Sequence, residues 1–494
     1  MASHPDLLDD RNVDPVYISK ARVLNAAIQD IGMGRYQYYL FICAGFGWFA
    51  DSVWPLITGL ILTPVIAEFK FNGPFLSLAG NVGLLVGAII WGLGADVWGR
   101  KWSFNLTLLI AGVFGLAAGG SPNFLTLASL LAVVGLGVGG NLPIDSAVFL
   151  DFVPASHQYL LTVMSVWWSL GQLLISLLAW PLIANFSCSS ASTCAKSDNM
   201  GWRYLLFILG ALTLILSLIR FFVFNLLESP RFLVGIGNDQ GAVDVIHQMA
   251  AYNSTTTSLS LEDLTGVEER YTDEKGTEVR SLLSKTSVFT LTHIKALFAT
   301  RKMAISTSML IALWGIIGLA STLYNSFLPF LLASRGAQFN DGSLYLTYRN
   351  QVILSVIGIP GAFLAGLAVE LPYIGRKGTL AISSGLTGAF LFASTTARSS
   401  VQLLGWNCGY VFFSNIMYGV LYAISPEIFP ANSRGTGNAL VSTATRVFGV
   451  IAPVIALYAN LATAVPVYIS GALIIGAGCM ALFLPFEPRG KASM

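Results

Sequence analysis

The sequence predicts an all-α membrane protein in which twelve transmembrane helices form two pseudo-symmetric six-helix bundles. Of its 494 residues, 55% are hydrophobic and 11% are charged, whereas about 25% are charged in soluble globular proteins. Apolar runs long enough to cross a bilayer recur along the chain, and two motifs of the first half return in the second. A chain this poor in charge cannot cover a water-facing surface, which excludes a soluble enzyme and a disordered scaffold. The net charge of +2 excludes a nucleic-acid-binding surface.

The apolar runs predict helices rather than the strands of a barrel. A transmembrane helix needs about 20 mostly apolar residues, whereas barrel strands alternate in polarity over about ten residues. The predicted helices cover residues 38–66, 75–95, 102–120, 124–150, 158–184, 201–226, 303–333, 348–369, 378–398, 400–425, 437–460 and 464–486.

Polar segments flank the two predicted bundles, which cover residues 38–226 and 303–486. Residues 1–37 are polar and mixed, so we expect a disordered cytoplasmic tail rather than a cleavable signal peptide. Residues 227–302 are rich in Asp, Glu, Lys, Ser and Thr. We expect them to be a cytoplasmic linker of short amphipathic helices around a flexible tract. Residues 487–494 form a short cytoplasmic tail.

The distribution of Lys and Arg predicts that both termini are cytoplasmic. With the N-terminus inside, cytoplasmic segments hold 19 of the 27 Lys and Arg residues. Asn185 begins a glycosylation sequon on the predicted outer face. Cys188 and Cys194 lie in the same outer loop and are the pair placed to form a disulfide there, the alternative being two free thiols.

Two unrelated motifs recur at one offset. Gly99 of a Gly-Arg-Lys loop returns as Gly375, 276 residues later, and the acid and proline of Asp151–Pro154 return at the same offset in Glu427–Pro430. Two signatures with one offset indicate duplicated halves. Halves with an even number of helices keep the same orientation, so the repeat is parallel and allows the halves to rock about a central site.

These motifs resemble those of the major facilitator superfamily, in its sugar-porter and synaptic-vesicle-glycoprotein-2-like branch. The loop from Gly92 to Lys101 is similar to the superfamily signature, and residues 228–233 and 426–430 resemble sugar-porter signatures. The resemblance implies transport by alternating access. Two sugar-porter features are missing, namely a Gln pair opening helix 7 and an Arg opening the glycine motif of helix 4. Asn141 replaces the Asp of phosphate symporters.

The resemblance also implies a cytoplasmic gate of charged residues that pair and separate as the halves rock. The alternative is that these charges only set topology and anchor helices at the membrane surface. The predicted gate residues are Asp96, Arg100, Lys101, Asp151, Glu228 and Arg231 in the first half, and Glu370, Arg376, Lys377, Glu427, Arg434 and Glu487 in the second.

Ionisable residues inside a membrane-spanning helix are functional candidates, because their burial is unfavourable. Asp51, Asp145 and Arg446 lie well inside predicted helices. We expect Asp51 to carry a coupled proton, with Asp145 second, the alternative being a static ion pair of either acid with Arg446. Arg220 lies near a helix end, and we expect it to snorkel to the membrane surface.

Arg446 and a set of polar and aromatic side chains form the predicted substrate site. An arginine grips a carboxylate in bidentate fashion. The alternative for the spaced residues of helix 10 is plain helix packing. Besides Arg446, the predicted substrate-binding residues are Asn141, Trp168, Gln172, Tyr324, Asn325, Asn415, Tyr418 and Tyr422.

Taken together, the sequence predicts a proton-coupled symporter of a small organic metabolite, with an organic acid favoured. A sugar–proton symporter, a passive uniporter and a membrane receptor of the same fold are the alternatives. We expect no enzymatic activity, no cofactor and no metal. The expected partners are a small-molecule substrate, protons and the lipid bilayer, and we expect a monomer. The expected location is the plasma membrane, with a vacuolar or vesicle membrane as the alternative.

Overall fold

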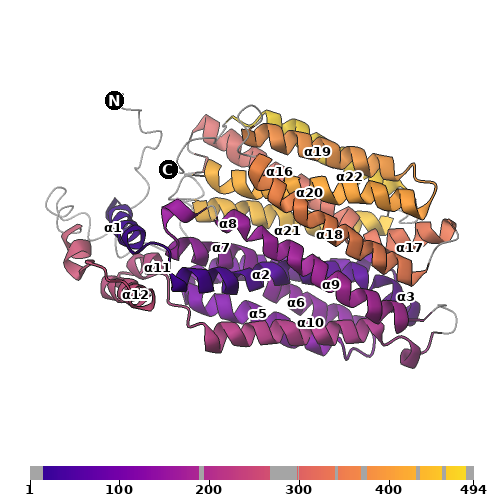
Figure 1. The fold of residues 1–494 in the computed structure, drawn as a ribbon, viewed down its shortest axis with the longest axis horizontal. Coiled ribbons are helices and arrows are strands. Elements are labelled where there is room, and N and C mark those ends of the chain that lie inside the picture. Colours follow the sequence, from indigo (N-terminus) through magenta and orange to yellow (C-terminus); the bar gives the residue numbers. More distant parts are fainter. Residues whose placement is uncertain are drawn as a thin grey trace.

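The computed structural model describes residues 15–158, 160–188, 194–267, 297–298, 300–339, 343–368, 375–429, 434–458 and 463–485. Two helical bundles lie against each other along their length (Figure 1). The first bundle contains α2 (Arg35–Leu60), α3 (Leu62–Phe69), α4 (Pro74–Trp98), α5 (Arg100–Ala118), α6 (Phe124–Val138), α7 (Asn141–Phe152), α8 (Leu160–Val163), α9 (Ser165–Asn185) and α10 (Gly201–Leu218), which continues as a π-helix over Ile219–Val223.

The second bundle contains α16 (Arg301–Asn325), α17 (Leu328–Gln338), α18 (Leu344–Ala368), α19 (Gly375–Ser394), α20 (Ser400–Ile428), α21 (Arg434–Tyr458) and α22 (Val465–Leu482). Several predicted spans are therefore broken into two helices. Within the described residues, nine helical stretches are long and apolar enough to cross a membrane. The remaining predicted spans correspond to α18, α19 and α20, and the predicted all-α fold is confirmed.

Glycines let the helices of the first bundle approach closely. A Cβ at Gly83 would lie 1.9 Å from the carbonyl oxygen of Ala132, and one at Gly139 would lie 2.2 Å from that of Leu84. No side chain fits at either position, so α4 packs backbone to backbone against α6. Small residues serve helix packing in this way in membranes.

The prediction of a disordered N-terminal tail is wrong for residues 15–31. They form the helix α1 (Pro15–Ile31), which packs on the short linker helices α11 (Pro230–Gly235) and α12 (Asp239–Tyr252) at one end of the bundles, here called the linker end (Figure 1). Lys20 pairs with Asp239. The buried apolar residues Leu24 and Ile28 explain why this segment folds, since they lie four apart on one helix face.

The linker end is fastened to the first bundle. Asn253 accepts a hydrogen bond from the backbone N–H of Tyr36 at 2.9 Å, and its amide donates to Gln37 at 2.8 Å. The Tyr36 hydroxyl accepts a hydrogen bond from the backbone N–H of Leu227 at 3.1 Å. The start of α2, the exit of α10 and the end of α12 are thereby tied together.

The opposite end, here called the disulfide end, carries the Cys188–Cys194 disulfide. Beside it, Glu68 accepts two hydrogen bonds from Arg203, at 2.7 and 2.8 Å, and one each from Trp202 and Asn199. The side chain of Glu68 is 9% exposed and that of Arg203 is 2% exposed. This buried cluster holds α3, the disulfide loop and the start of α10 together.

The Glu68 cluster gives the fold a pH-dependent contribution. Burial raises the pKa of Glu68. The hydrogen bonds from Arg203, Trp202 and Asn199 lower the pKa by a larger amount, so the net shift of the pKa is downward. The ionised form therefore stabilises the fold above the unfolded-state pKa, and this stability is lost as the pH falls through the folded-state pKa. Replacing Glu68 by Gln is expected to lower the free energy of unfolding by about 1–3 kcal/mol at neutral pH.

Melting temperatures of the detergent-purified protein between pH 7 and about pH 2.5 check this expectation, because the contribution is lost only below the ordinary Glu pKa of 4.5. The difference between wild type and Glu68→Gln should shrink as the pH falls. Substitution of the exposed Lys196 by Gln is the matched control. A gap of constant size across the range would show that the ionised carboxylate is not the source of the stability.

Candidate functional site

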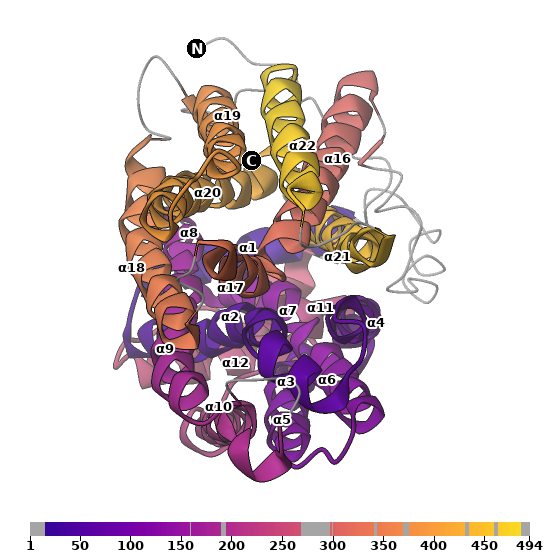
Figure 2. The same ribbon diagram turned by 90° about the vertical axis from the view of Figure 1, so that its right-hand side faces the viewer.

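The two bundles meet along two helix pairs, α9 with α18 and α4 with α21 (Figure 2). Within the described residues, hydrogen bonds join the halves from the middle of the helices to the disulfide end. Ser176 and Ser355 lie 2.9 Å apart between α9 and α18, and the Tyr348 hydroxyl donates to the Leu60 carbonyl. The candidate site lies in the middle of this interface.

An ion pair joins the halves at the centre. Arg446 of α21 donates to Asp51 of α2 at 2.6 Å. The Asp51 side chain is fully buried, whereas that of Arg446 is 13% exposed. The second carboxylate oxygen of Asp51 has no hydrogen-bond partner within the described part of the chain. Because the two charges belong to different halves, any rocking of one half against the other changes their separation.

A second ion pair lies wholly inside the first half, and it corrects the prediction that Arg220 snorkels. Arg220 is fully buried and donates to Asp145 at 2.8 Å. It also donates to the carbonyls of Cys43, Ala44 and Phe104, and its guanidinium lies 3.8 Å from the centre of the Phe104 ring. Arg220 lies in the π-helix, and its side chain points into the bundle rather than toward the membrane surface.

Gly47 makes room for this second pair. A Cβ at this position of α2 would lie 1.6 Å from a carboxylate oxygen of Asp145 and 2.9 Å from the Arg220 guanidinium. The pair therefore sits against the backbone of α2, one turn before Asp51. The Asp145–Arg220 pair therefore packs against the turn of α2 that leads to Asp51.

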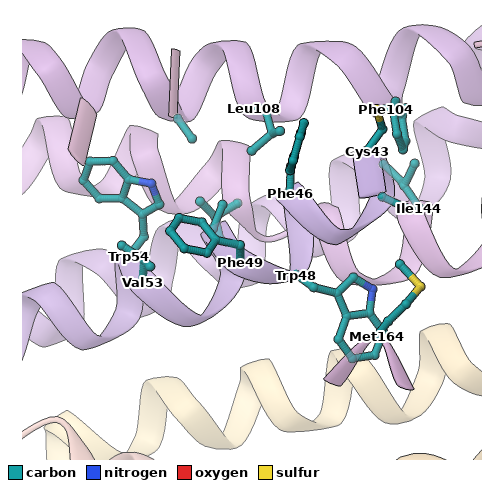
Figure 3. Packing of buried hydrophobic residues seen from close by; sticks show 14 of the residues in the cluster. Cys43, Phe46, Trp48, Phe49, Val53, Trp54, Phe104, Leu108, Ile144 and Met164 are labelled. Carbon is teal, nitrogen blue, oxygen red and sulfur yellow. The ribbon is translucent and has the colours of Figure 1, made fainter. Parts of the chain in front are cut away.

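Aromatic rings from both halves gather around Tyr422, which lies close to both Asp51 and Arg446. The Tyr422 ring of α20 lies 4.7 Å from Trp314, 5.5 Å from Trp48 and 6.5 Å from Trp168, measured between ring centroids. Figure 3 shows Trp48 turned away from Phe46 and Leu108, toward the pale ribbon of the second half. Trp48 precedes Asp51 by three residues, so both lie on one face of α2.

Other predicted substrate-binding residues have partners in the helix packing. The Tyr324 hydroxyl donates to Asn407, Asn325 accepts a hydrogen bond from Tyr410 at 3.0 Å, and the Asn415 amide donates to the Val411 carbonyl at 2.9 Å. These contacts hold α20 against α16 and stabilise α20 itself.

Asn141, Gln172 and Tyr418 complete the predicted substrate-site residues. Asn141 is fully buried, and neither polar atom of its side chain has a partner among the described residues. The backbone carbonyl of Gln172 accepts hydrogen bonds from Ser176 and Ser355. The Tyr418 ring lies 6.5 Å from that of Tyr422. Tyr418 thus lies beside the aromatic cluster, whereas Asn141 shares a face of α7 with Asp145.

A family model described as "Sugar (and other) transporter" matches residues 75–487. The chain belongs to this family of the major facilitator superfamily. It is 69% identical to "MFS siderochrome iron transporter 1" of Ceriporiopsis subvermispora (strain B), over 99% of this chain and 95% of that protein. It is 26% identical to "Niacin transporter NiaP" of Acinetobacter baylyi, over 89% of this chain and 91% of that protein.

Solved structures of the same fold include the xylose transporter XylE from E. coli in a partially occluded, inward-open conformation. The TM-score is 0.67 at 15% identity, and the match covers 91% of this chain and 100% of that chain. At this identity the match shows the fold alone. The family and the fold identify a transporter and not an enzyme.

The transporter's predicted gate residues of the first half, apart from Asp96, whose side chain is not described, come together at the linker end. Arg100 pairs with Asp151, and Arg231 approaches the same carboxylate at 3.6 Å. Glu228 accepts hydrogen bonds from the backbone N–H groups of Arg100 and Lys101, at 3.0 and 3.3 Å. The side chain of Lys101 itself turns to Asn225 at 3.0 Å.

For most predicted gate residues of the second half, the residue or its side chain is not among those that the structure describes. Glu370 and Glu487 are outside the described residues, and the side chains of Glu427 and Arg434 are not described. Arg376 is half-buried at the start of α19, and Lys377 donates to the Leu484 carbonyl near the end of α22. The gate hypothesis stays a prediction for both halves.

Sequence reasoning missed Arg220, Trp48 and Trp314 of the transporter. A signal for Arg220 existed, because an ionisable residue in the same half as an unpaired intramembrane acid is its natural partner. Trp48 and Trp314 gave no such signal, since an aromatic residue in an apolar helix is as expected in a core as in a site. Asn185, the predicted glycosylation site, is exposed at the disulfide end, where its amide donates to Pro181.

Proposed function

We propose that this transporter is a proton-coupled symporter of a small organic acid, working by alternating access. The Asp51–Arg446 pair carries the proposal, because it joins the two halves at a buried site. A guanidinium is the side chain best suited to hold a carboxylate by two parallel hydrogen bonds. An incoming carboxylate and Asp51 therefore compete for the same partner.

Charge balance then couples the proton to the substrate. In the empty site Asp51 neutralises Arg446, and in the loaded site the substrate carboxylate does so while Asp51 carries a proton. A substrate alone or a proton alone leaves one uncompensated charge in a buried site, which is strongly unfavourable. The site therefore changes from one membrane face to the other only when it is empty or when it holds both substrate and proton.

The Asp145–Arg220 pair has a different proposed role. Both side chains are fully buried within one half, and Arg220 is held by three backbone carbonyls as well as by Asp145. Such a pair does not change its partners when the halves rock. We assign it to positioning α2 and assign proton carriage to Asp51.

The names of relatives favour two different cargoes. NiaP is named as a niacin transporter, and niacin is a small organic acid, in agreement with the proposal. The relative with 69% identity is named as a siderochrome iron transporter, which makes a ferric siderophore the second candidate. The central pair favours the free acid, since it offers a single cation to the substrate.

We further propose that the linker end faces the cytoplasm, so that both termini are cytoplasmic. The Lys and Arg distribution supports this orientation. Location in the plasma membrane and a monomeric state complete the proposal. The Cys188–Cys194 disulfide and the Asn185 sequon at the opposite end fit a non-cytosolic face.

Flux into proteoliposomes with an imposed pH gradient tests the function. We expect uptake of a labelled monocarboxylic acid to rise when the outside is made acidic and to fall when a protonophore collapses the gradient. Labelled hexose and a labelled ferric siderophore are the competing cargoes. Uptake of the acid that ignores the gradient would contradict coupling, and uptake of the siderophore alone would overturn the proposed substrate class.

A further inference from the structure

The amide of Asn141, at the start of α7, is a buried polar group that the mechanism has not yet used. Its side chain is fully buried, and neither its Nδ2 nor its Oδ1 has a partner among the described residues. The Oδ2 of Asp51 likewise has no partner within the described part of the chain, whereas its Oδ1 accepts a hydrogen bond from Arg446. Buried polar groups without partners are unfavourable, so their presence calls for a state in which they are paired.

The packing of α7 on α2 places the Asn141 amide level with Asp51. Three contacts fix the register of the two helices, and they join Tyr36 to Phe152, Phe41 to Phe149 and Gly47 to Asp145. The residue numbers rise along α2 while they fall along α7, so the helices are antiparallel. The turn of α2 after Gly47 carries Asp51, and the turn of α7 before Asp145 carries Asn141. Asn141 and Asp51 therefore lie opposite each other, each on the helix face that packs against the other helix.

An amide and a guanidinium suit different protonation states of a carboxyl group. An ionised carboxylate only accepts hydrogen bonds, and a guanidinium only donates them. A protonated carboxyl group both donates and accepts, and a primary amide does the same. Its O–H group can donate to Oδ1 of Asn141 while its carbonyl oxygen accepts from Nδ2 of the same amide. Arg446 is thus the suitable partner of ionised Asp51, and Asn141 is the suitable partner of Asp51 that carries a proton.

We infer that Asn141 is the residue to which Asp51 turns when it is protonated. This inference rests on the proposed function, and it adds how the proton-carrying form is held. A proton taken up from the water phase neutralises Asp51, its bond to Arg446 breaks, and the carboxyl group bonds to Asn141 instead. Arg446 then holds the substrate carboxylate, and no buried charge is left without a partner. Asn141 is accordingly a positioning residue of the proton site and not a contact of the substrate.

The charged and titratable groups around Asp51 come from three neighbouring helices. Among the described residues, Arg446 of α21 and Tyr422 of α20 act on Asp51 electrostatically, and so does Asp145 of α7, which Arg220 neutralises. A test of the inference must leave all of these groups in place or change them equally in every sample. Substitution of the uncharged Asn141 meets this condition.

Infrared spectra of the detergent-purified full chain, recorded during an acid titration, test the inference without any substrate. The titration uses Arg446→Met as its background, because Asp51 then lacks the cation that keeps it ionised and takes up a proton more readily. The carbonyl stretch of protonated Asp51 is the band that a further Asp51→Asn change removes. Adding Asn141→Leu removes both hydrogen bonds to the protonated form. We therefore expect the band to move to higher frequency and its midpoint to fall by about one pH unit, the change that loss of a net hydrogen bond produces.

A second variant and a control separate this role from plain packing. Asn141→Asp should move the midpoint in the opposite direction, because two carboxylates that share a site hold one proton more tightly. Asn105→Leu removes another buried amide of the first half, whose Nδ2 donates to the Lys101 carbonyl, and should leave the band unchanged. In the chain that keeps Arg446, Asn141→Leu should melt no lower than wild type at pH 8, since the amide has no described partner while Asp51 is ionised.

Three results would overturn the inference. They are an Asp51 band whose frequency and midpoint are the same with Asn141 and with Leu, the absence of such a band at every pH at which the fold is intact, and a large loss of melting temperature in Asn141→Leu at pH 8. Because the titration contains no substrate, each of these results leaves the flux test of the proposed function to be decided separately. Flux that ignores the pH gradient, together with the expected infrared shifts, would overturn the proposed function and not the pairing of Asp51 with Asn141.

Discussion

Replacement of Asp51 by Asn is expected to abolish proton-driven accumulation while exchange of substrate across the membrane continues. Asn resembles the protonated carboxyl group in shape and charge, so Arg446 stays available to the substrate. The loaded carrier can still cross in both directions. The empty carrier cannot, because Arg446 is then a buried charge without its partner, and return of the empty site is required for net uptake.

Two assays on the same proteoliposomes separate these steps. Uptake under an acid-outside gradient should fall to the level of vesicles without protein, and counterflow from preloaded vesicles should persist. Ser52→Ala is the matched control, because Ser52 is buried beside Asp51 and, among the described residues, donates to the Phe49 carbonyl of its own helix alone. Gradient-driven accumulation by Asp51→Asn would show that Asp51 does not carry the coupled proton.

Replacement of Arg220 by Met is expected to give the largest loss of stability of any single change considered. Asp145 would be left as an uncompensated buried charge, and breaking a buried ion pair in this way costs about 3–5 kcal/mol. Asp145→Leu alone should cost a similar amount, because it strands the Arg220 guanidinium. The double variant with both changes should recover most of the loss, since an apolar pair of similar volume replaces the ions.

Thermal unfolding in detergent, followed by size-exclusion chromatography, compares the three variants with wild type. Substitution of Arg398, which is exposed at the start of the segment leading into α20, by Met controls for removal of a positive charge. Melting temperatures that fall additively in the double variant would show that the two residues stabilise the fold independently. Recovery in the double variant identifies a clamp rather than a proton site.

The fold could be predicted from the sequence, because the length of the apolar runs and the repeat of two motifs at one offset extend over the whole chain. It also singled out Asp51 and Arg446, which the structure pairs across the two halves, since a charge deep in an apolar helix stands out. It failed for Arg220, because distance to a helix end does not show which way a side chain points. Tyr324 and Asn325 were assigned to the substrate site because polarity in a span is ambiguous between a cavity and a helix contact.

The error at α1 has a different origin. Its residues alternate between polar and apolar with too little hydrophobicity to fold alone, and the surface that stabilises them is formed by linker helices more than 200 residues away. A pattern read along the chain does not contain that surface. Long-range docking decides the structure of such a segment, whereas a transmembrane helix is determined by its own residues and the lipid.

The hydrogen bonds at the linker end make the two halves of the transporter unequal. Asn253, Tyr36 and Leu227 brace the linker helices to the first bundle, and α1 rests on the same helices. The described linker helices are thus attached to the first bundle, and in alternating access they would move together with it. A covalent modification of these helices would therefore act on the first bundle and not on the second.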